Sequence, residues 1–300
     1  MKKILSLVAF VPMLLLALCT ISCGSDDDTP TPSTGGEGGG NTTAETPDVV
    51  LYTFTNAAAD YASLELTEDS RYIIQRAQSS SPNKVRQYGD TKKATCLAPG
   101  AKAAHTRVSA YESMIVEGKF TKKDGSYILE GFGIATIVVK DKTATVTITE
   151  NGKEAKVLTA NMTTPTGKES DLTNKVCHSW KVTKIEVTSE GESTPIISGT
   201  PEQIEEQIEE GAPTEITVSK VGTYMIKYTY GEPEVAHWRW YDEAKAIMQY
   251  TWEYNATDIN WDSRTDSGFC VISVDGNNAV VKEDIEEEGL TMVTYLTRTK

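Results

Sequence analysis

Short stretches in which apolar and polar residues alternate follow one another along most of the chain from residue 49 onward. Val, Ile, Thr and Tyr are frequent in these stretches, and Gly, Asn, Asp or Lys residues separate them. A period of two with this composition is typical of β-strands. The pattern predicts strands in the first half at residues 49–55, 63–66, 72–78, 114–120, 127–131, 135–139, 144–149 and 156–160.

The second half repeats the pattern and adds one helix. Strands are predicted at residues 180–188, 215–219, 224–230, 235–241, 247–254, 269–274, 279–282 and 291–298. A short helix is predicted over residues 202–210, because Thr200 is a typical N-cap, Pro201 suits the first helical position, Gln203 completes a capping box and Gly211 ends the run.

The apolar positions of the two halves also coincide in sequence. Residues 63–74 align with 215–226, and residues 134–146 align with 269–281. The matched pairs are Leu64 with Ile216, Leu66 with Val218, Tyr72 with Tyr224, Ile74 with Ile226, Ile137 with Ile272, Val139 with Val274, Ala144 with Ala279 and Val146 with Val281. Two copies of one plan explain this match, although alternation alone also generates such similarity.

A polar segment at residues 162–171, with one Pro and one Gly, separates the halves. We therefore expect an N-terminal β domain over residues 49–163 and a C-terminal β domain over residues 172–300.

The first residues have the pattern of an export signal. A positive start at residues 1–3 precedes an apolar run at residues 4–18, which is too short for a comfortable membrane span. Ser22 and Cys23 follow this run, and a small residue before a cysteine at this place resembles the lipobox of bacterial lipoproteins. The resemblance implies a signal peptide over residues 1–22 and a lipid on Cys23. The alternative is an ordinary secretory signal with incidental cysteines.

Residues 23–48 are rich in Gly, Ser, Thr and Pro and have no repeating apolar position, so we expect a disordered, flexible tether. Its acidic start at Asp26, Asp27 and Asp28 resembles the tract that directs lipoproteins of Bacteroides-type bacteria to the cell surface. The resemblance implies a lipid anchor in the outer membrane and display outside the cell, with the periplasmic face as the alternative. A solvated charge run is the other interpretation of the tract.

The second half resembles bacterial lipocalin-like domains. The resemblance rests on Leu172 to Lys175 followed by Trp180, on the short acidic helix, on Gly222 to Tyr224, and on the closing segment from Gly289 onward. It covers residues 172–300, and it reaches residues 49–160 only through the internal match. It implies an all-β protein with two small antiparallel lipocalin-like barrels or half-barrels in tandem, with one short helix in the second.

Large aromatic residues gather on two consecutive predicted strands. Alternation places Trp238 and Trp240 on one face of the first strand, and Tyr250, Trp252 and Tyr254 on one face of the next. We call these five residues the aromatic wall. Such a wall can bind a ligand with planar or sugar rings, and it can equally be the core of a small barrel.

Net charge and cysteine usage exclude several kinds of site. The 43 acidic residues outnumber the 29 basic ones, which disfavours a broad nucleic-acid surface. No CxxC spacing occurs, and we expect no metal and no cofactor. Cys177 and Cys270 lie in one half and can pair or remain buried thiols, and Cys96 is left over.

Charge is also shared unevenly. The second half carries 23 acidic and 11 basic residues, whereas residues 79–111 hold six basic residues and one acidic residue. This basic segment has little periodicity. It fits an ordered functional loop, an insertion that docks on the acidic half, or a solvated loop.

No catalytic motif is found, so we predict no enzyme activity and no catalytic residues. The acidic runs at residues 202–210 and 286–288 could pair for glycosidase chemistry, but they are typical of solvated faces. The sequence therefore predicts a surface-anchored, non-enzymatic lipoprotein that binds a small ligand, a glycan, a haem or a protein outside the cell. The alternative is a structural or adhesive surface protein with filled barrels.

Overall fold

The computed structural model describes residues 48–55, 60–77, 114–166, 169–208, 211–252, 259, 261–262, 267–285 and 289–299. All of them belong to one compact unit, Thr42–Lys300.

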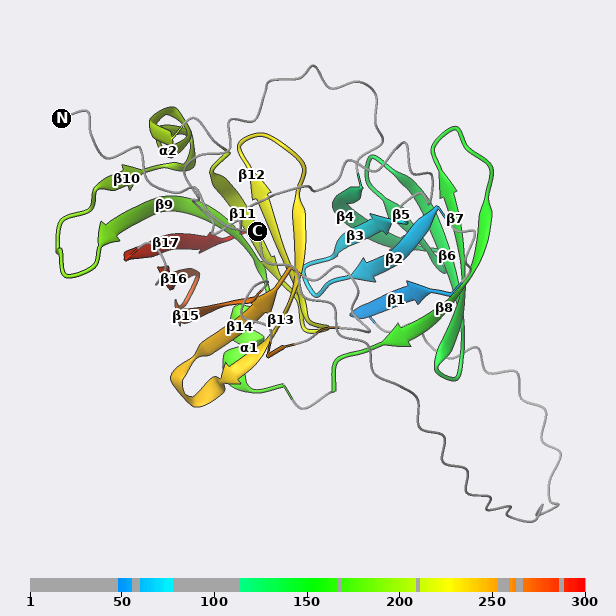
Figure 1. Cartoon of the computed structure of the whole chain (residues 1–300). Coiled ribbons are helices and arrows are strands. Elements are labelled where there is room, and N and C mark those ends of the chain that lie inside the picture. Colours follow the sequence, from blue (N-terminus) through cyan, green and yellow to red (C-terminus); the bar gives the residue numbers. More distant parts are fainter. Residues whose placement is uncertain are drawn as a thin grey trace, which may run out of the picture. The chain divides into compact units, whose positions relative to one another are not determined.

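The first barrel is closed and antiparallel, and its eight strands follow chain order (Figure 1). Closure comes from the pairing of the last strand with the first, in which Tyr52 lies opposite Met162. The strands are β1 (Val50–Phe54), β2 (Tyr61–Leu66), β3 (Arg71–Arg76), β4 (Ile115–Lys123), β5 (Ser126–Leu129), β6 (Gly133–Lys140), β7 (Thr143–Glu150) and β8 (Lys156–Thr163).

The second barrel closes through its long first strand. Strand β9 pairs with β11 near its start, with the short β10 near its end, and with β17 along its other edge. Its elements are α1 (Asp171–Val176), β9 (Ser179–Ser189), β10 (Ile197–Gly199), α2 (Pro201–Ile208), β11 (Pro213–Val218), β12 (Thr223–Tyr228), β13 (Glu234–Asp242), η1 (Glu243–Lys245), β14 (Ile247–Thr251), β15 (Ser267–Asp275), β16 (Asn278–Ile285) and β17 (Leu290–Arg298).

The predicted all-β fold with two antiparallel barrels in tandem is confirmed, and each strand predicted from the alternation is present. The predicted helix is α2, and its capping box forms, because Gln203 Oε1 accepts a hydrogen bond of 2.9 Å from Thr200 N. The alternation missed the three-residue strand β10. It also missed α1, whose N-cap Ser170 accepts a 3.0 Å hydrogen bond from Thr173 N.

The internal match corresponds to equivalent cross-strand pairs in the two barrels. Leu64 pairs with Ile74 and Leu66 with Tyr72, and in the second barrel Ile216 pairs with Ile226 and Val218 with Tyr224. The pairs Ile137–Val146 and Val139–Ala144 correspond in the same way to Ile272–Val281 and Val274–Ala279. When the short β10 is left out, the matched residues occupy the second, third, sixth and seventh strands of each barrel, which is what two copies of one plan require.

The turns between the matched strands are also alike. Thr67 N donates to Arg71 O at 2.9 Å, and Ser219 N donates to Thr223 O at 2.9 Å. Both turns need a positive φ just before the second strand, which Ser70 adopts at 55° and Gly222 at 95°. Glycine adopts this region without steric cost, and serine less readily.

Each barrel has a separate hydrophobic core. The core of the first barrel draws on residues between Val50 and Met162, with Tyr52, Tyr72 and Tyr127 among its largest buried side chains. The core of the second lies between Leu172 and Leu296 and is centred on the fully buried Trp180. Trp180 Nε1 donates to Val176 O at 2.9 Å, which fastens α1 to the barrel. Among the residues described, no helix is long and apolar enough to cross a membrane.

Candidate functional site

The aromatic wall faces the interior of the second barrel. Trp238 lies opposite Tyr250 across β13 and β14, and Trp240 lies opposite Met248, so the shared face is confirmed. The Trp238 and Trp240 rings meet edge to face at 5.4 Å, and the Tyr250 and Trp252 rings at 5.8 Å. Tyr254 lies outside the described residues.

The polar atoms of the wall find partners inside the barrel. Trp238 is 7% exposed, and its Nε1 donates to Ser219 O at 2.8 Å. Tyr250 is 4% exposed, and its hydroxyl donates to Glu283. Buried Trp and Tyr need such partners, and here the protein supplies them. This arrangement favours the core interpretation, and ligand binding by the wall stays a prediction.

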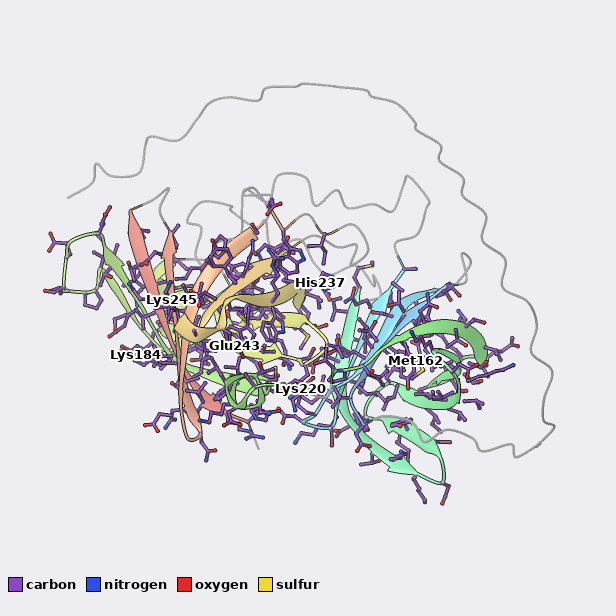
Figure 2. The ribbon with its side chains drawn as sticks, turned by 90° about the horizontal axis from the view of Figure 1, so that it is seen from below. Met162, Lys184, Lys220, His237, Glu243 and Lys245 are labelled. Atoms are coloured by element: carbon purple, nitrogen blue, oxygen red, sulfur yellow. The ribbon has the colours of Figure 1, made fainter. Side chains whose placement is uncertain are left out.

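Helix α1 and the turn η1 enclose the Trp240 end of the wall. Trp240 Nε1 donates to Thr173 Oγ1 at 2.8 Å, and Thr173 Oγ1 donates to Glu243 Oε1 at 3.3 Å. Ser170 Oγ also donates to Glu243. Figure 2 labels Glu243 and Lys245 on this turn, whose Lys245 Nζ is 2.9 Å from Asp242. The half-buried Trp240 is thus fixed by a chain of hydrogen bonds.

The outer face of the same strands carries exposed rings. Tyr241 is 63% exposed and Phe269 is 43% exposed, and their ring centroids lie 5.0 Å apart at 77°. Val271 beside them is 44% exposed. Exposed large apolar groups that cluster in this way often mark interaction sites. Together with Arg239 and Trp261, we call these residues the outer platform.

A polar network holds the outer platform in place. The Arg239 guanidinium lies 4.6 Å from the centroid of the Trp261 ring, a cation–π distance. Arg239 Nε donates to Gln249 Oε1 at 3.0 Å, and Gln249 Nε2 donates to Trp261 O at 2.6 Å. Gln249 is 2% exposed although it faces outward, because these neighbours cover it. Gln249 also lies directly opposite Phe269 across β14 and β15, so the network reaches the exposed rings.

The sequence analysis did not identify the outer platform. Its signal was present, because Tyr241 has the opposite strand parity to Trp238 and Trp240. Alternation separates two faces of a strand, but the larger set of rings drew attention to the face that proves to be inward.

Charged side chains gather where the two barrels meet. Arg71 Nη2 is 2.6 Å from Glu117 and 2.8 Å from Glu215. Lys227 Nζ is 2.7 Å from Glu117 and 3.3 Å from Glu215. Partial burial raises the pKa of Glu117, but hydrogen bonds and charge from Lys227 and Arg71 outweigh it and bring the pKa below its ordinary value. Glu117 is therefore ionised at neutral pH, and the four groups form a balanced ionic cluster.

Glu65 is a second, almost wholly buried acid at this junction, 1% exposed. Thr223 Oγ1 donates to its Oε2 at 2.5 Å. Burial raises the pKa of Glu65 to about 7, although hydrogen bonds from Ser219 and Thr223 oppose the rise. Burial likewise raises the pKa of nearby Glu68 to about 7. Both acids therefore titrate near neutral pH.

The two described cysteines are buried thiols that do not pair with each other. Cys177 and Cys270 are free, and burial raises the pKa of both far above the ordinary value, so neither is an activated nucleophile. His178, next to Cys177, instead has Nδ1 3.0 Å from Asp69 Oδ1. Among the described residues, no group of three or more His, Cys, Asp or Glu side chains could hold a metal ion.

Several predicted features lie outside the described residues. They are Cys23 with its acidic tract, Cys96, the basic segment at residues 79–111 and the acidic run at residues 286–288. The structure neither supports nor opposes these predictions.

No family model matches the chain, and no curated protein is similar to it in sequence. Among solved structures, the chain is similar to the isotype 1 transferrin binding protein B from serogroup B Neisseria meningitidis. The identity is 12%, the TM-score is 0.23, and the match covers 85% of this chain and 45% of that one. The chain thus spans less than half the length of that structure. A likeness this weak carries no argument about function.

Proposed function

We propose that this chain is a lipid-anchored surface protein that binds carbohydrate through the outer platform of its second barrel and catalyses no reaction. The observation that carries the proposal is the pair of exposed rings, Tyr241 and Phe269, on the outer face of β13 and β15. The lipocalin-like relationship predicted from the sequence belongs to the same proposal.

Aromatic rings at a protein surface suit sugars. The C–H face of a pyranose ring is apolar and packs on an aromatic ring, while its hydroxyl groups need hydrogen-bond partners. Arg239 is exposed beside the rings and donates only its Nε to Gln249 among the described residues. A guanidinium carries five N–H donors, and the proposal assigns its Nη groups to sugar hydroxyls. The network through Gln249 and Trp261 fixes these groups before the ligand arrives, which reduces the entropy lost on binding.

Anchoring complements this site. A lipid on Cys23 and a flexible segment over residues 23–48 would hold the barrels near the membrane and let them turn toward an extended ligand. We infer an outer-membrane location with display outside the cell from Asp26–Asp28. The periplasmic face is the alternative.

Native affinity electrophoresis tests the proposal, with purified protein run in gels that contain soluble plant, fungal or mucin polysaccharides. We expect at least one polysaccharide to slow the wild-type protein, and Tyr241→Ala and Phe269→Ala to abolish the retardation. Ile134→Ala is the matched control, because Ile134 is 46% exposed on the other barrel. Equal retardation of all variants would contradict a role for the outer platform.

A structural or adhesive role is the second candidate function. The internal partners of Trp238, Trp240 and Tyr250 support it, because hydrogen bonds to the protein occupy the polar atoms of these three side chains. No retardation by any polysaccharide, together with no spectral change on adding haemin, would support this candidate and leave a protein partner as the remaining ligand class.

A further inference from the structure

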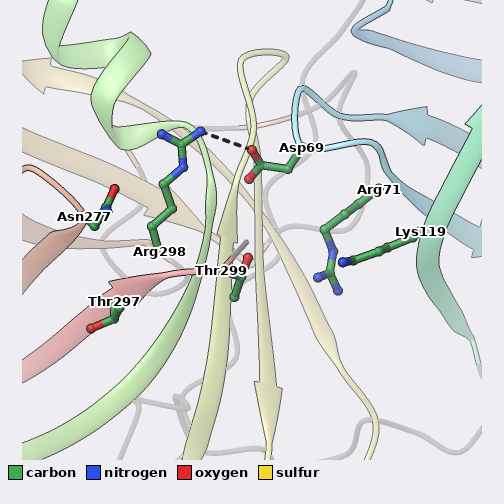
Figure 3. A pocket seen from close by; sticks show the side chains of 7 residues that line it. All are labelled: Asp69, Arg71, Lys119, Asn277, Thr297, Arg298 and Thr299. Atoms are coloured by element: carbon green, nitrogen blue, oxygen red, sulfur yellow. Dashed lines mark ion pairs between the residues drawn. The ribbon is translucent and has the colours of Figure 1, made fainter.

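Arg239 of the outer platform differs from the other arginines in the described part of the chain. Those three are paired with carboxylates: Arg71 with Glu117 at 2.6 Å, Arg76 with Glu150 at 3.1 Å, and Arg298 with Asp69 at 3.6 Å, the pair drawn in Figure 3. Arg239 is exposed, and its hydrogen bond and its ring contact are both with neutral groups, the Gln249 side chain and the Trp261 ring. An exposed guanidinium that pairs with no carboxylate of the described residues suits a carboxylate from outside the protein.

Two contacts orient the Arg239 guanidinium. Its Nε donates to Gln249 Oε1 at 3.0 Å, and its Cζ lies 4.6 Å from the centroid of the Trp261 ring. A guanidinium has five N–H donors in a planar fork, and Nη1 and Nη2 hold four of them. A carboxylate accepts from one N–H of each Nη in the bidentate arrangement, so the other two serve neighbouring hydroxyl groups. Because Arg239 is already held, binding costs it less side-chain entropy.

Carboxylates on the neighbouring strands have partners of their own. Asp242, at the end of β13, is 2.9 Å from Lys245 Nζ. Asp284 on β16 is 3.2 Å from Lys282 Nζ, and its Oδ1 accepts a hydrogen bond of 2.7 Å from Thr291 Oγ1. These two acids are therefore balanced by other groups and not by Arg239. This separation is notable in a half of the chain that carries 23 acidic and 11 basic residues.

The rings and the guanidinium lie close enough for one sugar chain to reach both. Arg239 is opposite Gln249 across β13 and β14, and Gln249 is opposite Phe269 across β14 and β15. Neighbouring strands are ~4.8 Å apart, so the backbones of Arg239 and Phe269 are about 10 Å apart. Tyr241 follows on the same face of β13, two residues beyond Arg239. This spacing suits an oligosaccharide better than a single sugar.

We propose that the carbohydrate bound by the outer platform is acidic, with carboxylate groups such as those of uronic acids, and that Arg239 binds one carboxylate through Nη1 and Nη2. The inference rests on the proposed function, because it names the class of carbohydrate that the same surface binds. General attraction would not explain such binding, since a protein of net charge −14 repels a polyanion. The affinity must come from a local site.

Isothermal titration calorimetry of the full-length protein tests this inference at constant ionic strength. The probes are short oligosaccharides of polygalacturonate, alginate and hyaluronan, each compared with the same oligosaccharide after reduction of its carboxyl groups to neutral alcohols. We expect at least one acidic oligosaccharide to bind, and its reduced form to bind about tenfold more weakly or less, the loss expected for a hydrogen bond to a charged group. Equal affinity of the two forms would overturn the inference.

Variants assign the preference to Arg239. Arg239→Gln should weaken binding of the acidic form about tenfold or more and affect the reduced form much less. Arg239→Lys keeps the charge but not the planar fork, so its affinity should lie between those of Arg239→Gln and the wild type. Equal losses for both forms in Arg239→Gln would indicate a structural role only and contradict the inference. Circular dichroism verifies that both variants fold.

Lys184→Gln is the matched control. Lys184 is an exposed lysine on β9 that is paired with Glu186 at 2.6 Å, and it lies outside the outer platform. Removing its charge should leave the affinity for the acidic oligosaccharide unchanged. A loss equal to that of Arg239→Gln would show that overall charge, and not Arg239, sets the affinity.

The inference and the proposed function can fail separately. Tyr241→Ala should weaken the acidic and reduced forms alike, because packing on a ring does not depend on the carboxylate. If neutral polysaccharides slow the protein in gels and no acidic oligosaccharide binds, the acidic ligand is wrong and carbohydrate binding stands. If no carbohydrate binds or slows the protein, the proposed function itself is wrong.

Discussion

Replacing Glu65 with Gln should stabilise the protein at mildly alkaline pH. Glu65 is buried at the junction of the barrels, and burial raises its pKa from an ordinary value of 4.5 to about 7. The folded protein therefore binds this proton more tightly than the unfolded chain does. The resulting stability is fully present below pH 4.5 and is lost as the pH rises through about 7.

The magnitude follows from the two pKa values. Each pKa unit corresponds to about 1.4 kcal/mol, so ionisation of Glu65 costs about 3 kcal/mol at pH well above 7. Gln keeps the carbonyl oxygen that accepts from Thr223 Oγ1 and cannot ionise. Its amide nitrogen can donate to Ser219 Oγ, a hydroxyl with spare acceptor capacity. We expect Glu65→Gln to match the wild type near pH 4.5 and to exceed it by about 2–3 kcal/mol at pH 8.

Urea unfolding between pH 4.5 and pH 8 measures this difference. Glu68 titrates in the same range, and the charge of Glu65 contributes to its raised pKa, so the variant's stability minus that of the wild type at each pH reports Glu65 together with this coupling. Glu192→Gln, at an exposed turn residue, is the control and should leave the pH profile unchanged. Parallel profiles for wild type and Glu65→Gln would refute the argument that burial at the junction holds the proton on Glu65.

Three further predictions concern anchoring, domain independence and the aromatic wall. Cys23→Ala should release the protein from membranes, because the predicted lipid is attached to that sulfur, and unchanged detergent partitioning would exclude lipidation there. Replacing Asp26, Asp27 and Asp28 with Ala tests surface display, which is measured by protease access to intact cells. A chain that begins at residue 169 should unfold cooperatively by itself, because the described core of the second barrel lies between Leu172 and Leu296. A molten, aggregating fragment would show that the barrels depend on each other. Trp238→Ala should lower the free energy of unfolding by about 3–5 kcal/mol, as expected for a buried tryptophan. A decrease below about 1 kcal/mol would contradict the core interpretation of the aromatic wall and favour ligand binding there.

The fold was readable from the sequence because alternation carries most of the information in a small barrel. Tyr72 and Tyr224 already indicated equivalent strands, and both prove to begin the inward face of the third strand in their barrels. Closure of the first barrel was harder to predict, because it depends on the pairing of Tyr52 with Met162, which lie 110 residues apart in the chain. Helix α1 has capping and charge signals at Ser170, Asp171 and Lys175, but a segment of six residues is too short to show a helical period of apolar positions.

The candidate sites were harder to predict from the sequence than the fold, for a physical reason. Period two assigns Trp238 and Tyr241 to opposite faces but does not say which face is buried. That depends on barrel closure, which turned the larger rings inward. The ionic cluster at the junction depends on the contact of Arg71 with Glu215, two residues from different barrels. No local pattern records such a contact.

A crystal structure with an oligosaccharide of the polysaccharide that slows the protein most would test carbohydrate binding directly. The account predicts a sugar ring against Tyr241 and Phe269, with a hydroxyl group within hydrogen-bond distance of the Arg239 guanidinium. A sugar bound inside the second barrel against Trp252, or bound on the first barrel, would contradict it.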